Sequence, residues 1–156
     1  MTKHAPRLIR SAQVDLPVVE ASGLASKLVD GRVVVLVVGD RTAHVAAGIY
    51  DADTAFTDWR TFDLSVLEGW PLSRQDSQFE AIAVDGGSLI ALMREDPPVV
   101  LVADTVAKVL RTQITLIAPP GSPLHGKWDD PSSRGEGLVL LRRGRILVAK
   151  EKQPAG

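Results

Sequence analysis

The 156-residue sequence contains no cysteine, which excludes disulfides and thiolate metal sites and fits a reducing compartment. Its longest apolar run, residues 33–38, is far shorter than the about 20 residues of a membrane-spanning helix. The amino terminus is basic but lacks the apolar stretch and cleavage site of a secretory signal. These absences predict a cytoplasmic protein with no membrane partner.

The sequence also lacks an excess of charge of either sign, because its 18 Lys and Arg residues are interspersed with 19 Asp and Glu residues. A basic surface for nucleic acid is therefore not expected. The sequence contains neither a G-x-S-x-G elbow nor a glycine-rich phosphate-binding motif, and His4, His44 and His125 show no metal-ligand spacing. A serine hydrolase triad and a nucleotide site are thus unsupported.

What the sequence does contain is a repeat. Three segments each carry a glutamate, a small residue, a short apolar stretch, a glycine turn and a β-rich run that ends in an acid. The glutamates are Glu20, Glu80 and Glu136, separated by 60 and then 56 residues, and the closing acids are Asp40, Glu95 and Glu151. Similarity at such a period indicates a repeat architecture, and each repeat can hold a four-stranded sheet.

The second repeat shows its strands most clearly, because glycines at 86–87 separate two apolar runs as in a hairpin. Alternating and apolar runs predict strands at 22–25, 32–38, 43–50 and 58–64 in repeat one, at 79–84, 89–93, 99–102 and 110–117 in repeat two, and at 137–141 and 145–150 in repeat three. No long helix is expected, and residues 65–69 and 106–110 could each hold one helical turn.

Tandem four-stranded meanders are typical of a β-propeller, in which the first strand of each blade lines a central channel. We therefore predict an all-β fold, a partial propeller of about two and a half four-stranded antiparallel blades in a single domain over 1–156. Blade one covers 19–64, blade two 79–117 and the first half of blade three 135–152, with 7–16 as an outer strand of another blade. A β-sandwich of about ten strands is the alternative.

Propellers have about four to eight blades, so two and a half leave sheet faces and a strand edge uncovered. The sequence therefore predicts either self-association or pairing with the remainder of a longer propeller.

The glutamate pattern before a glycine hairpin, in Glu20 with Asp40, Glu80 with Glu95 and Glu136 with Glu151, resembles the phytase-like and SdiA-regulated β-propellers. The resemblance covers most of residues 19–156 as one short motif per blade. It implies inner-strand glutamates that point toward the channel, sometimes with calcium bound there, and a family in which hydrolase activity is often assigned. This chain departs from the family in having too few blades to close the channel.

The acids are the candidate site. Glu80 and Glu95 are 15 residues apart, as are Glu136 and Glu151, so a hairpin turn midway should bring each pair together. Calcium takes about six to eight oxygen ligands, and converging acids could supply several. The candidate metal ligands are Glu20, Glu80, Glu95, Glu136 and Glu151. In the competing interpretation the same glutamates have a structural role, repeated because the fold repeats.

Two functions stay open on this sequence. The favoured one is a propeller binding or scaffold module for an unidentified small-molecule ligand. The other is a calcium-dependent phytase-like or esterase-like hydrolase, for which Arg94 and Lys150 would have to face a bound anion.

Overall fold

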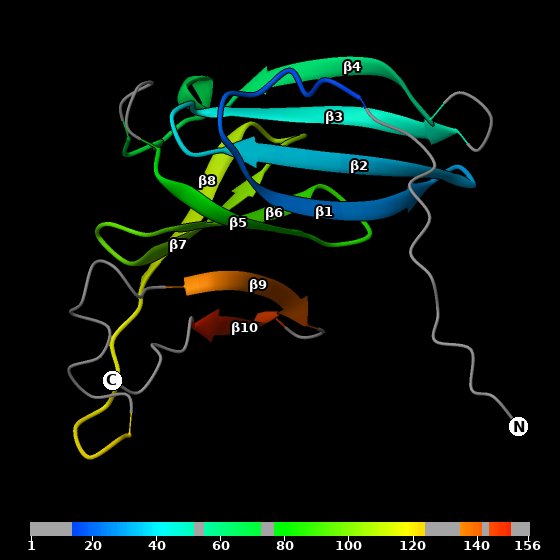
Figure 1. The fold of residues 1–156 in the computed structure, drawn as a ribbon. Coiled ribbons are helices and arrows are strands. Elements are labelled where there is room, and N and C mark those ends of the chain that lie inside the picture. Colours follow the sequence, from blue (N-terminus) through cyan, green and yellow to red (C-terminus); the bar gives the residue numbers. More distant parts are fainter. Residues whose placement is uncertain (1–13, 52–54, 73–76, 124–134, 142–143, 151–156) are drawn as a thin grey trace, which may run out of the picture.

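A computed structural model describes residues 14–51, 55–72, 77–123, 135–141 and 144–150 (Figure 1). This part of the chain forms three antiparallel sheets, two with four strands and one with two. The strands are β1 (Ala21–Val29), β2 (Arg32–Gly39), β3 (His44–Asp51), β4 (Ala55–Asp63), β5 (Phe79–Val84), β6 (Leu89–Arg94), β7 (Val99–Asp104), β8 (Val109–Thr115), β9 (Gly135–Leu141) and β10 (Arg145–Lys150). The predicted all-β fold with its two meanders and a half is confirmed.

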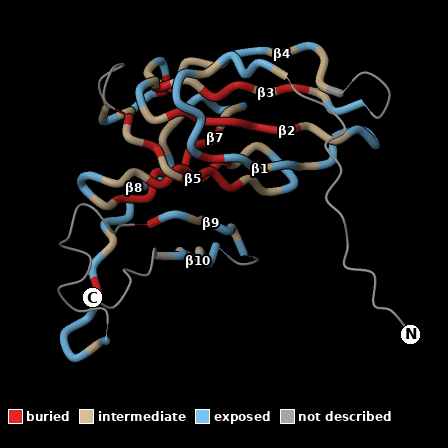
Figure 2. Tube along the Cα trace, in the orientation of Figure 1, coloured by how far each residue is buried: buried red, intermediate tan, exposed pale blue. Residues whose placement is uncertain are grey.

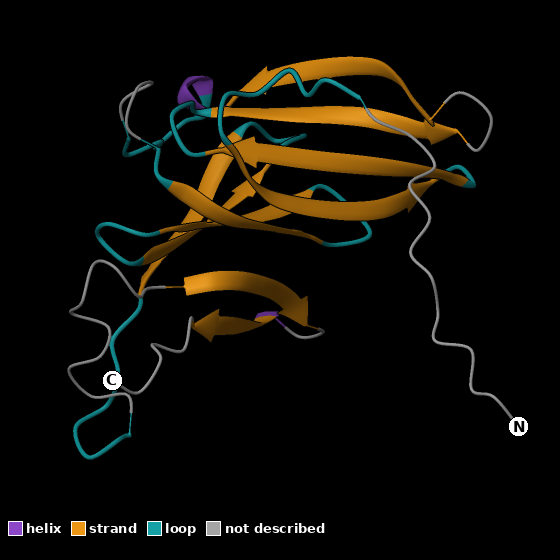
Figure 3. Ribbon diagram, viewed as in Figure 1, coloured by secondary structure: helices purple, strands orange, loops and turns teal. Residues whose placement is uncertain are grey.

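The sheets follow one another as blades, each a simple meander in chain order. The first strands, β1, β5 and β9, lie innermost, and β5 contacts both of its counterparts (Figures 1 and 3). Each neighbouring pair of sheets thus packs face to face, as in a partial propeller, and blade two is covered on both faces. In the sandwich alternative, two sheets would instead share a single core.

Two apolar clusters hold the blades together. The larger lies between blades one and two and includes Leu36, Val38, Ile82 and Leu92. The smaller joins blade two to the half-blade through Ala91, Met93 and Leu138, among others. Figure 2 shows that the buried residues concentrate in β2, β3, β5 and β7.

The first hairpin is longer than predicted. The sequence predicts an inner strand at 22–25, whereas β1 continues to Val29 and pairs that residue with Arg32. The turn between them is Asp30–Gly31, and both residues have positive φ, 49° and 76°. Two consecutive positive φ values are what a two-residue hairpin turn requires, so residues 26–29 still belong to the strand.

Three further predictions concern the ends and loops. Of the predicted outer strand 7–16, residues 7–13 lie outside the described residues, and 14–16 are not in a strand. The turn predicted at 65–69 is a 3₁₀ helix, η1 (Leu64–Val66). Asp63 caps its start, because Asp63 Oδ1 accepts a hydrogen bond from the Ser65 N–H at 2.9 Å. Residues 105–108 form a turn without a helix. No helix among the described residues has the length and apolar character needed to cross a membrane.

Candidate functional site

The three inner strands begin with the same irregularity. Pairing of each inner strand with its neighbour skips one residue near the start, which is the signature of a β-bulge. The paired residues on either side are Ala21 and Gly23 in β1, Phe79 and Ala81 in β5, and Gly135 and Gly137 in β9. The skipped residues are therefore Ser22, Glu80 and Glu136, and these occupy equivalent positions.

This register corrects one prediction. The sequence predicts that Glu20, Glu80 and Glu136 are equivalent, but Glu20 lies two residues before Ser22, outside β1. Its structural counterpart is Gln78: both have positive φ, 51° and 45°, and both carbonyls accept an N–H from the end of the next strand. The glutamate in repeat one thus matches the others in residue type but not in register.

Glu20 also has a partner outside the inner strands. Its carboxylate accepts a hydrogen bond from Arg41 Nε at 2.9 Å, and both side chains are largely exposed. An exposed pair of this kind contributes about 0–1 kcal/mol to stability. Ser22, which takes the equivalent place in β1, donates its hydroxyl to the Phe79 carbonyl and so links the inner strands of blades one and two.

The closing acids behave as predicted in blades one and two. Asp40 and Glu95 each follow the last paired residue of the second strand, and their N–H groups donate to the Glu20 and Gln78 carbonyls at 3.0 Å in both cases. The hairpin therefore returns Glu95 to the start of β5, close to Glu80. Glu151, the corresponding acid of the third repeat, lies outside the described residues.

The acids of different blades influence one another at Glu80. The pKa of this half-buried carboxyl group is raised from 4.5 to about 7, mainly by burial and in addition by the negative charges of Glu95, Asp40 and Glu136. All of the causes act in the same sense, because each opposes the charged form of Glu80. The structure thus gathers acids from three blades around one carboxyl group.

Asp40 is the member of this group that sequence analysis did not assign to the site. Its place is fixed by the residues that precede β5: Gln78 N donates to the Asp40 carbonyl at 2.7 Å. The hydroxyl of Ser77, which is fully buried, lies 3.0 Å from the Asp40 carbonyl and 2.8 Å from that of Thr42. The repeat of closing acids marks Asp40 in the sequence, but only the structure shows that it is near enough to Glu80 to interact electrostatically.

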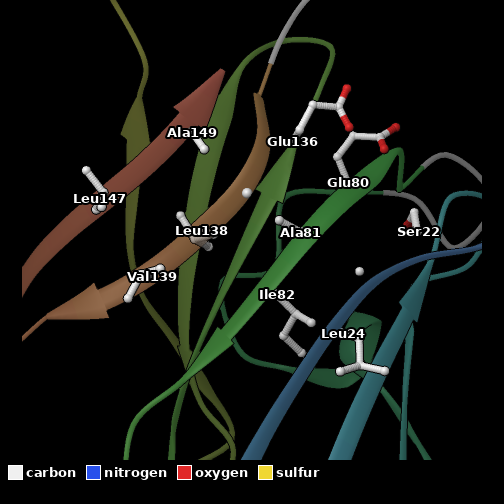
Figure 4. Close-up of a pocket in the computed structure, with 12 residues that line it drawn as sticks. Ser22, Leu24, Glu80, Ala81, Ile82, Glu136, Leu138, Val139, Leu147 and Ala149 are labelled. Atoms are coloured by element: carbon white, nitrogen blue, oxygen red, sulfur yellow. The ribbon is translucent and has the colours of Figure 1, made fainter. Parts of the chain in front are cut away.

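A pocket of about 270 Å³ lies between the inner strands of all three blades. Figure 4 shows Glu80 and Glu136 side by side, with both carboxylates directed toward the same end of the pocket. The remaining wall is mainly apolar and includes Leu24, Ile82 and Leu138. The pocket therefore combines negative charge at one end with an aliphatic surface along its length.

The arrangement does not form a ready metal centre. Among the residues that the structure describes, no three His, Cys, Asp or Glu side chains are grouped closely enough to hold a metal ion. Glu80, Glu95 and Glu136 are near enough to interact electrostatically, whereas Glu20 is paired with Arg41. The predicted calcium site consequently stays a prediction, with Glu80, Glu95 and Glu136 as its remaining described ligands.

Comparison of the sequence with known protein families and with curated proteins finds no match.

Proposed function

We propose that the protein is a propeller-type binding module whose inner-strand pocket accepts a small organic cation. The observation that carries the proposal is the convergence of Glu80 and Glu136 at one end of a largely aliphatic pocket (Figure 4). A positively charged group at that end would relieve the repulsion that Glu80 experiences from Glu95, Asp40 and Glu136. The aliphatic wall suits the apolar part of such a ligand.

Proton release supplies a signature of this mode of binding. With a pKa of about 7, Glu80 is about half protonated at neutral pH. A bound cation favours the carboxylate, so binding at neutral pH should release a fraction of a proton. A ligand that occupied only the aliphatic wall would release none.

Calorimetric titration with a small quaternary ammonium ion, in two buffers that differ in ionisation enthalpy, tests the proposal. We expect saturable binding whose apparent enthalpy differs between the buffers. Glu80→Gln should weaken binding about tenfold and remove the buffer dependence, because it removes one negative charge from the end of the pocket that receives the cation. Glu20→Gln is the matched control, since Glu20 is paired with Arg41 outside the pocket. Equal weakening by both substitutions would contradict the proposal.

Calcium is a second candidate ligand, supported by the mutual repulsion among the acids around Glu80. If Ca²⁺ binds them, it should raise the melting temperature, since a ligand of the folded state stabilises that state by mass action. Glu80→Gln should abolish the rise, and substitution of His44, on β3, should leave it intact. No rise in the unmodified protein would eliminate calcium as the ligand.

The calcium-dependent hydrolase stays a prediction as well. Ser22 lines the pocket, but its hydroxyl is engaged by the Phe79 carbonyl, which gives it a structural role. An assay of phosphate and carboxylate esters with and without Ca²⁺ separates the two functions, because a binding module shows no turnover.

A further inference from the structure

The described wall of the pocket between the inner strands offers side-chain acceptors rather than side-chain donors. The carboxylates of Glu80 and Glu136 only accept hydrogen bonds when they are ionised. The other polar side chain in the wall is that of Ser22, and its hydroxyl hydrogen is donated to the Phe79 carbonyl. Among the described residues that line the pocket, none is basic. A cation that fits this wall should therefore bring N–H donors of its own.

The same wall lacks the aromatic surface on which quaternary ammonium ions are usually held. Such ions have no N–H group and are recognised mainly by the faces of aromatic rings. No described residue of the lining is aromatic. Phe79, which precedes Glu80, is fully buried, and its ring packs on that of Trp70 in the cluster between blades one and two, with centroids 6.1 Å apart. The lining thus favours a protonated amine over a quaternary ammonium ion.

The two carboxylates are placed to share one ammonium group. Glu80 and Glu136 come from equivalent bulges of β5 and β9, and their side chains lie side by side at one end of the pocket (Figure 4). A primary ammonium group has three N–H donors and can bond to both carboxylates at once. Charge-assisted hydrogen bonds of this kind are about twice as strong as neutral ones. They distinguish a primary ammonium ion from a quaternary ion of equal charge.

The aliphatic wall favours an unbranched chain behind the nitrogen. It leads away from the carboxylates, with Leu24 on one side and Leu138 and Leu147 on the other (Figure 4). Complete burial of one methylene group raises an affinity about fourfold. Because Leu24 and Leu147 are 65% and 57% exposed, the wall is partly open to solvent. A chain along it should therefore gain about two- to fourfold in affinity per methylene group.

We propose, on the basis of the function proposed above, that the ligand is a primary alkylammonium group carried by an unbranched aliphatic chain. The nitrogen lies between the carboxylates of Glu80 and Glu136, and the chain lies along the aliphatic wall. The proposal names the class of cation, and it requires that the pocket accepts a cation.

Calorimetric titration with n-butylammonium and with tetramethylammonium tests the proposal, because the two ions have the same charge and the same number of carbon atoms. We expect n-butylammonium to bind about tenfold more tightly or better, since only this ion donates hydrogen bonds. Equal binding, or tighter binding of tetramethylammonium, would overturn the proposal and leave the cation site standing. If neither ion binds, the cation site is wrong and both proposals fail.

A series from n-propylammonium to n-hexylammonium tests the role of the aliphatic wall. Affinity should rise about two- to fourfold with each methylene group. Leu24→Ser should flatten this rise and change tetramethylammonium binding less, and Leu147→Ser, on the opposite side, should do the same. Val106→Ser is the matched control, because Val106 is 81% exposed in the turn between β7 and β8 and does not line the pocket.

Circular dichroism of each variant should show a folded β protein, since all three substituted side chains are mostly exposed. An affinity that does not rise along the series in the unmodified protein would overturn the unbranched chain. A rise that persists unchanged in both folded serine variants of the wall would overturn its placement.

The same ammonium group occurs in free amines and at the end of lysine side chains. Titration with Nα-acetyl-lysine N-methylamide distinguishes these sources. Affinity within about threefold of n-butylammonium would identify a lysine side chain of a peptide as a source, whereas a greater loss would restrict the site to free amines. The proposal fails if neither compound binds more tightly than tetramethylammonium.

Discussion

The absence of a side chain at residue 23 brings the inner strands of blades one and two together. A Cβ placed on Gly23 would lie 2.9 Å from Ala81 Cα and 3.0 Å from Ile82 N. These are backbone atoms of β5, which cannot yield by a change of rotamer. Glycine is needed here for close approach of two strands.

We predict that Gly23→Ala destabilises the protein by about 1–3 kcal/mol, the usual cost of inserting a group into a tightly packed site. Urea unfolding followed by circular dichroism measures the change. Gly86→Ala is the matched control, because a Cβ on Gly86 meets no atom within 4 Å, and it should change stability by less than about 0.5 kcal/mol. Similar losses in both variants would show that the contact with β5 is unimportant.

The raised pKa of Glu80 predicts a pH dependence of stability. Its pKa is about 7 in the folded state against an ordinary 4.5, so the folded state holds this proton more tightly than the unfolded state does. Stability should therefore fall as the pH rises from about 4.5 to about 7, and the loss should be complete above that interval.

Glu80→Gln should remove this part of the pH dependence and be more stable than the unmodified protein at pH 8. Because the side chain is half exposed, we expect a gain of about 1–2 kcal/mol, less than the full shift implies. Chemical denaturation at acidic and basic pH measures it, with Glu20→Gln as the control that keeps the original profile. A glutamine variant with an unchanged profile would contradict the assignment to Glu80.

Among the elements, the turn from β7 to β8 is held by one carboxylate. Asp104 accepts the N–H of Val106 at 3.1 Å and that of Ala107 at 3.0 Å, and Arg111 donates to its other oxygen at 2.8 Å. The hydrogen bond from Ala107, followed by those from Arg111 and Ser88, holds the pKa of Asp104 well below its usual range. The charged form thus stabilises the turn across ordinary pH.

Asp104→Ala should lower the melting temperature at pH 7, since it leaves these N–H groups without their acceptor. The difference from the unmodified protein should persist down to about pH 4, the usual aspartate pKa, and shrink as the pH falls further. Arg111→Ala removes only the ion pair, whose arginine is half exposed, and should lower the melting temperature less. The reverse order would show that the ion pair dominates.

Sequence patterns located the strands well because the strands alternate and glycines mark the turns. The prediction for β5, residues 79–84, agrees with the structure at both ends. Register at the start of β1 was not predictable in the same way: the bulged residue of β1 is Ser22, so Glu20 lies two residues before the position that Glu80 occupies in β5, and residue types alone do not reveal where a bulge falls. The candidate site was predicted only in part. Asp40 belongs to it because the Ser77 hydroxyl, which precedes β5, donates to the Asp40 carbonyl, and such a contact between separate blades cannot be read from the sequence.

At the scale of the whole molecule, the self-association expected from the sequence should make stability depend on protein concentration. We predict that the melting temperature rises with protein concentration, because mass action favours an assembly of folded chains. Differential scanning calorimetry over an about hundredfold range of concentration measures the rise. A concentration-independent transition in the unmodified protein would show that each chain is stable alone.

The bulge of β1 carries a hydroxyl where the bulges of β5 and β9 carry carboxylates. Of the three bulge side chains, those of blades two and three are therefore acidic and that of blade one is neutral, while Asp40 adds the negative charge that blade one contributes near Glu80. A ligand with one cationic end could not rotate freely about the axis between the blades. It would be held in a single orientation, with its cationic end at the carboxylates and its uncharged end along the aliphatic wall.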